Sequence, residues 1–84
     1  MPTISSFYGI IIMMYLKDKE HNPPHIHAFY GDDAATFYIN SGEIYEGSFP
    51  SRGKKLVKEF VIKYKDELLN MWETGNYIKL KGLE

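Results

Sequence analysis

The chain has 84 residues, of which 44 % are apolar and 15 % aromatic, a composition typical of one small folded domain and not of a disordered segment. It contains no cysteine, which excludes disulfides, thiolate zinc sites and cysteine nucleophiles. Ten Lys and Arg against 11 Asp and Glu give a net charge of −1, without the basic excess of a typical nucleic-acid-binding module. Because Met1-Pro2-Thr3 lacks a basic leader and the apolar run at 10–16 is too short to span a bilayer, we expect a cytoplasmic protein.

The first part of the chain predicts antiparallel strands separated by turns. The run at 10–16 is apolar throughout, which favours a central strand covered on both faces. In the segment 25–30, a period of two places His25, His27 and Phe29 on one face and the intervening side chains on the other. The predicted strands are 3–7, 10–16, 25–30, 34–40 and 43–48, the last as an edge strand.

The second part predicts one long amphipathic helix at 51–73. Pro50 and Ser51 mark its start, and Gly75 and Asn76 end it. Its apolar stripe consists of Leu56, Val57, Phe60, Val61, Tyr64, Leu68, Leu69 and Trp72.

The predicted fold is therefore a single α+β domain over residues 1–84. Four or five strands form an antiparallel meander, and one long C-terminal helix packs on one face. The short tail at 74–84 adds a last strand at 77–80. Since one helix covers only one face of the sheet, the other face is expected to be solvated, to form a homodimer or to carry the function.

All three histidines lie within seven residues, at His21, His25 and His27. His25 and His27 are two apart on a predicted strand, so their side chains leave the same face about 7 Å apart. His21 could return through the loop stiffened by Pro23 and Pro24 as a third ligand. Three histidines with one water form the ligand set of a catalytic zinc site, so a divalent metal such as zinc is one expected cofactor.

Two other interpretations of the histidines stay open. As catalytic residues, His21, His25 and His27 could transfer protons during RNA cleavage, close to Lys17 and Lys19. As structural residues, His25 and His27 would lie half-buried and bonded to the backbone or to Asp18 or Asp32. The sequence does not decide between the metal-binding, catalytic and structural interpretations.

The start of the predicted helix is basic. Its first turns hold Arg52, Lys54, Lys55 and Lys58, whereas Asp66, Glu67 and Glu73 lie toward its end. A helix dipole favours the opposite order by about 0.3–1 kcal/mol per charge. Because helix N-termini bind anions, the four cations predict a patch for phosphate, RNA or an acidic partner; the alternative is a solvated face with pairs such as Glu59–Lys63.

The opening Met1-Pro2-Thr3-Ile4, the signature His21-Asn22-Pro23-Pro24-His25-Ile26-His27 and the helix ending near Trp72 carry a resemblance over residues 1–73. The chain resembles a small bacterial family, domain of unknown function 4160. Its members are often encoded beside another small protein and have been proposed as toxin–antitoxin components. The resemblance implies a cognate protein partner, with RNA as a second candidate ligand, through the histidine loop and the basic helix start. Glu20 and the lysines of the helix start replace an Asp and arginines that the family usually carries.

Overall fold

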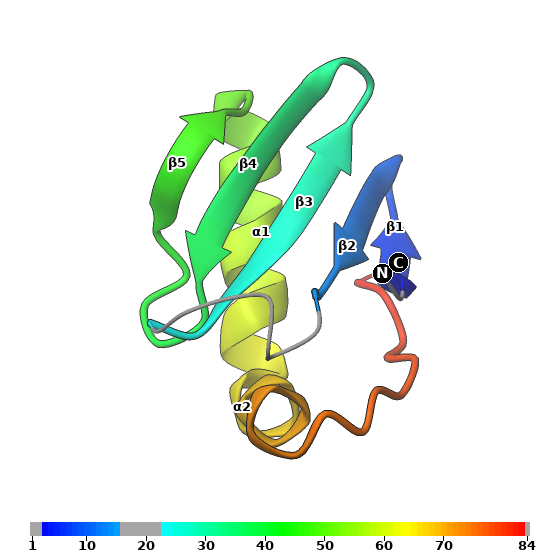
Figure 1. Cartoon of the computed structure of the whole chain (residues 1–84). Helices are drawn as coiled ribbons and strands as arrows, with labels where there is room; N and C mark the ends of the chain where they lie inside the picture. The colour runs from blue at the N-terminus through cyan, green and yellow to red at the C-terminus, as the bar shows by residue number, and fades with distance from the viewer. Residues whose placement is uncertain (1–2, 16–22, 84) are drawn as a thin grey trace.

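The protein is described by a computed structural model that places residues 3–15 and 23–83. Five strands form one antiparallel sheet in the order β1-β2-β3-β4-β5, so each strand pairs with the next along the chain (Figure 1). The strands are β1 (Thr3–Phe7), β2 (Ile10–Met13), β3 (His25–Tyr30), β4 (Asp33–Tyr38) and β5 (Ile44–Ser48). Two helices follow, α1 (Ser51–Lys63) and α2 (Lys65–Thr74). The predicted α+β class and the antiparallel meander are confirmed.

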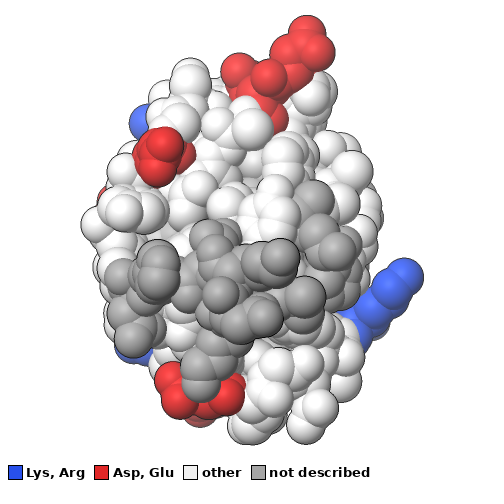
Figure 2. All heavy atoms as spheres, in the orientation of Figure 1, with Lys and Arg blue, Asp and Glu red and all other residues white. Residues whose placement is uncertain are grey.

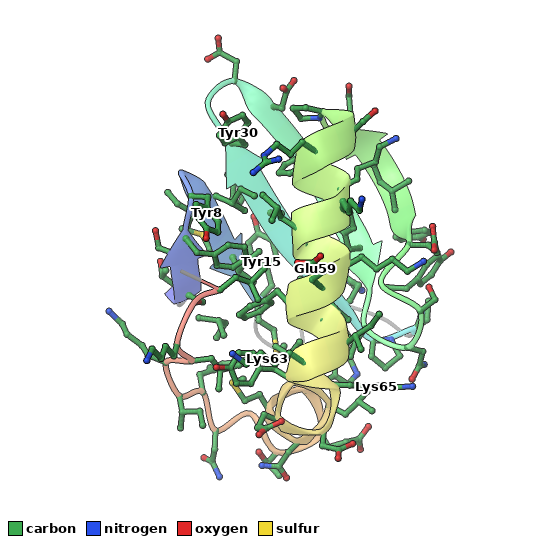
Figure 3. All side chains as sticks on the ribbon, turned by 180° about the vertical axis from the view of Figure 1, so that it is seen from behind. Tyr8, Tyr15, Tyr30, Glu59, Lys63 and Lys65 are labelled. Carbon is green, nitrogen blue, oxygen red and sulfur yellow. The ribbon has the colours of Figure 1, made fainter. Side chains whose placement is uncertain are left out.

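The core lies between one face of the sheet and the helices. Alternate strand residues such as Ile12, Ile26 and Phe37 are fully buried on this face, as the period of two predicts. From α1, Val57 and Phe60 meet them, and the rings of Phe7 and Phe60 stack with their centroids 5.0 Å apart. Seen from behind, α1 runs across the sheet on this side only (Figure 3).

The predicted single helix is instead two helices that meet at Tyr64. Tyr64 has φ −113° and ψ 24°, outside the helical region, and α2 turns away from the axis of α1 (Figure 1). The break brings Leu68, Met71 and Trp72 into the core. It also places Asp66 and Glu67 in the first turn of α2, where the dipole favours them. The charge order that opposes the helix dipole, with cations at the N-terminus, is therefore found only in α1, which has no acidic residue in its first turn.

Two strand predictions are wrong in part. β2 ends at Met13, and Ile11 is 38 % exposed, so β2 is covered on one face and not on both. The segment 77–80 is not a strand, although the N–H of Leu80 donates to the carbonyl of Ile4 at 2.8 Å. The tail therefore returns along β1 and ends beside the N-terminus (Figure 1). Across the described residues, neither helix has the length and apolar character needed to cross a membrane.

Candidate functional site

The face of the sheet opposite α1 carries the second set of strand side chains. Directly paired residues of antiparallel strands project to the same side, so the strand register defines rows across this face. One row holds Ser6, Ile11, Phe29, Ala34 and Ser48. The next holds Thr3, Met13, His27, Thr36 and Glu46. Apolar and aromatic side chains thus occupy most of the middle of these rows, serine, threonine and one glutamate occupy their ends, and Lys and Arg are absent from both.

Figure 2 shows this side of the molecule; among the described residues, acidic side chains are seen toward its margins and Lys and Arg at its outline. We call it the open face, and the rows above define it. Within it lies a shallow hollow of about 260 Å³. The hollow is lined by His27, Phe29, Ala34, Ala35, Thr36, Glu46 and Gly47. Two of its members are small: Ala34, which pairs with Phe29, has only a methyl group, and Gly47 has no side chain.

His25 lies at the start of β3, where α2 approaches the sheet. Its side chain is 6 % exposed, and its ring centroid is 5.0 Å from that of Trp72 and 5.3 Å from that of His27. Its Nδ1 lies 2.9 Å from the carbonyl oxygen of Pro23. Since a carbonyl only accepts, Nδ1 carries the proton and donates. This environment, a buried ring bonded to the backbone, agrees with the structural interpretation of His25.

His27 occupies a different environment on the open face. It is half-buried and lines the hollow. The ring of Tyr15 meets it edge-on at 4.1 Å between centroids, and the hydroxyl of Thr36 lies 3.5 Å from its Nδ1, a long and weak hydrogen bond. Of the two described imidazoles, His27 is therefore the one placed to contact a ligand.

The predicted metal site has two of its three ligands in the described part of the chain. His25 and His27 face each other, as the spacing of two predicts. Among residues 3–15 and 23–83, no group of three or more His, Asp or Glu side chains could hold a metal ion. His21, Asp18 and Glu20 lie outside the described residues, so a zinc site stays a prediction.

The basic helix start lies far from the histidines. Arg52 lines a pocket with Tyr30, at the end of β3, whereas His25 lies at its start beside α2. The 13 residues of α1 separate the two regions by about 20 Å. Arg52, Lys54, Lys55 and Lys58 are all exposed, and Lys58 forms a salt bridge with Glu43. The histidine pair and the helix start therefore do not share one cleft.

Sequence reasoning did not identify the hollow. Its smallest members, Ala34 and Gly47, look unremarkable in the sequence; the strand register alone pairs Ala34 with Phe29 and Gly47 with Ala35. Tyr45, which is 49 % exposed and packs on Tyr38 with centroids 4.9 Å apart, was also missed. The available signal was the period of two at 43–48, which sets Tyr45 in an edge strand.

A protein-family model described as a domain of unknown function, DUF4160, matches residues 9–73. The matched segment contains β2 to β5, α1 and nearly all of α2, and so includes the histidine pair and the hollow. Neither the curated proteins nor the solved structures contain a match to the chain.

Proposed function

Since the chain belongs to the DUF4160 family, whose description assigns no activity, we propose from its surface that it binds a cognate protein through the open face, as one component of a toxin–antitoxin-type pair. The hollow beside Phe29 and His27 is the observation that carries this proposal. A partner would insert an apolar side chain there, and the apolar middle of the rows would surround it.

The charge of the open face favours a protein over RNA. Proteins that bind RNA on a sheet combine stacking aromatics with cations that neutralise phosphates. The open face has the aromatics Phe29 and His27, but its two rows contain no Lys or Arg and one carboxylate, Glu46. A protein partner with an apolar anchor and a basic side chain at its rim fits this surface in shape and in charge.

The two described histidines have separate roles in this proposal. His25 is too buried to contact a partner, and it holds the start of β3 against Trp72 and Pro23. His27 forms one wall of the hollow and contacts the inserted side chain. Binding then depends on His27 directly, and on His25 only through the fold.

The test is the affinity for the product of the neighbouring gene, which is the cognate partner that the family resemblance implies, measured by calorimetry with purified components. Ala34→Arg fills the hollow and adds a charge to it, and we expect the dissociation constant to rise at least about tenfold, equivalent to about 1.4 kcal/mol. Ile62→Arg is the matched control, since Ile62 is 62 % exposed on the outer side of α1 and lies outside the open face. We expect this control to bind as the original protein does.

Three results would contradict the proposal. The first is equal binding by the original protein and the Ala34→Arg variant. The second is light scattering that shows a dimer of the protein alone, which Ala34→Arg converts to a monomer; the open face would then belong to a second copy of the chain. The third is RNA binding that Ala34→Arg strengthens or abolishes in the absence of the partner protein.

A further inference from the structure

A second pocket lies about the length of α1 away from His25. It is formed where the first turn of α1 meets the β1–β2 turn and the end of β3, and its volume is about 150 Å³. It is lined by Tyr8, Ile10, Tyr30, Pro50, Arg52, Gly53 and Leu56. These residues come from three segments that are far apart in the sequence, at 8–10, 30 and 50–56, and the open face contributes none of them.

The size and walls of the pocket suit one aromatic ring. A cavity of about 150 Å³ holds a molecule of the size of benzene. Ile10, Leu56 and Pro50 supply apolar walls, and Tyr8 and Tyr30 supply two aromatic rings that are 51 % and 43 % exposed. Figure 3 shows both tyrosines on the same side of α1, toward its N-terminal end. A flat ring entering the pocket would thus meet two tyrosine side chains against which it can pack.

The charge at this pocket is positive. Arg52 lines it, and within the described residues the Arg52 guanidinium forms no ion pair. Lys54 and Lys55 follow on the same helix, whose first turn has no acidic residue and whose N-cap, Pro50, offers no side-chain hydrogen bond. The first backbone N–H groups of α1 therefore add to the attraction that Arg52 exerts on an anion.

Tyr8 occupies a backbone position that disfavours its residue type. Tyr8 and Gly9 have φ of 49° and 80°, both positive, as in the two-residue hairpin turn that favours Asn-Gly. A bulky side chain in the left-handed region costs about 1–2 kcal/mol relative to glycine. At Gly9 a Cβ atom would lie 3.2 Å from the ring of Tyr30, so the turn packs closely against this wall of the pocket. The strained position sets an aromatic side chain at the pocket, where the favoured Asn would provide none.

We propose that this pocket binds a nucleoside monophosphate, with one ring of the base in the pocket beside Tyr8 and Tyr30 and the phosphate at Arg52. The phosphate is favoured over a single carboxylate because three cations lie within the first five residues of α1. The guanidinium of Arg52 can donate two parallel hydrogen bonds to phosphate oxygens. This site is independent of the open face, and its ligand can bind while a protein occupies the hollow.

The experiment titrates the full chain with AMP and follows backbone amide shifts by NMR, with adenosine, inorganic phosphate and phenylacetate as separate probes. We expect AMP to saturate, with shifts at residues 8–10, 30 and 51–56. Arg52→Gln should raise the dissociation constant for AMP at least about tenfold. Adenosine should bind the original protein about as weakly as AMP binds the Arg52→Gln variant. Tyr8→Asn keeps a favourable turn and should weaken AMP binding by a similar factor. Lys65→Ala is the control and should leave binding unchanged, because Lys65 lies at the far end of α1, where α2 begins (Figure 3).

The proposal fails if AMP gives no saturating shift, or if Arg52→Gln binds AMP as the original protein does. Phosphate binding as tightly as AMP would exclude a role of the ring, and phenylacetate binding as tightly would exclude the phosphate. A Tyr8→Asn variant that folds and binds AMP normally would remove Tyr8 from the site.

Discussion

Replacing each described histidine by alanine should separate a structural residue from a binding residue. His25 is 6 % exposed and fixed by Pro23 and Trp72, whereas His27 faces the hollow. We expect His25→Ala to lower the stability of the fold more than His27→Ala does. At a temperature where both variants are folded, His27→Ala should weaken binding of the cognate protein more than His25→Ala does.

The magnitude follows from the contacts of His25. The hydrogen bond from Nδ1 to Pro23 contributes about 1 kcal/mol, and the ring contacts with Trp72 and His27, 5.0 and 5.3 Å between centroids, about 0.5–1.5 kcal/mol each. The sum is about 3 kcal/mol, a large part of the 4–13 kcal/mol or so expected for a chain of 84 residues. His27→Ala loses two ring contacts, with Tyr15 and with His25, and one long hydrogen bond, about 2 kcal/mol in total.

The assay is equilibrium unfolding in urea followed by circular dichroism, with thermal unfolding as a second measurement. His25→Ala should lower Tm by about 12–24 °C and His27→Ala by about 8–16 °C. His25→Asn keeps a donor near Nδ1 without the ring, and should recover about 1 kcal/mol of the loss. The reasoning is refuted if His27→Ala destabilises the protein as much as His25→Ala, or if His25→Asn is no more stable than His25→Ala.

Two further substitutions test the sheet and the helix break. Gly47 has φ +98°, and an added Cβ would lie 2.4 Å from the carbonyl oxygen of Ala34, so Gly47→Ala should lower the free energy of unfolding by more than about 2 kcal/mol. Gly31 has φ +57° with open space around it, so Gly31→Ala should lower the free energy of unfolding by about 1 kcal/mol in the same thermal assay. Equal losses of stability in the two variants would contradict the predicted clash at Gly47. Asp66→Asn and Glu67→Gln should each destabilise by about 0.3–1 kcal/mol, because these acids begin α2. A gain in stability on urea unfolding would instead indicate one continuous helix.

The two proposed sites differ in the chemistry that they offer. The open face is apolar and rimmed by carboxylates, which suits a protein surface, and the pocket at Arg52 joins aromatic walls to a cation, which suits a small anion with a ring. The two sites lie on opposite faces of the sheet, since Phe29 lines the hollow and the next residue, Tyr30, lines the pocket, so both can be occupied together. Substitutions in one site are therefore expected to leave binding at the other unchanged.

The sequence by itself determined the local structure. The period of two in 25–30 placed His25 and His27 on one face, and the apolar spacing from Leu56 to Trp72 identified the residues that the helices bury. The signature around His25 identified the family, which the match over residues 9–73 confirms. These features depend on neighbouring residues only, so a repeating pattern is sufficient to reveal them.

Tertiary structure decided the rest. The apolar spacing continues unchanged through Tyr64, and the chain breaks there because α2 turns to pack Trp72 against His25 at the end of the sheet. The packing of α1 along the sheet separates the histidine pair from Arg52 by about the length of this helix. It also brings Tyr8 and Tyr30 together with Arg52 around one pocket. Such convergence depends on contacts between residues distant in the chain, and no local period encodes them.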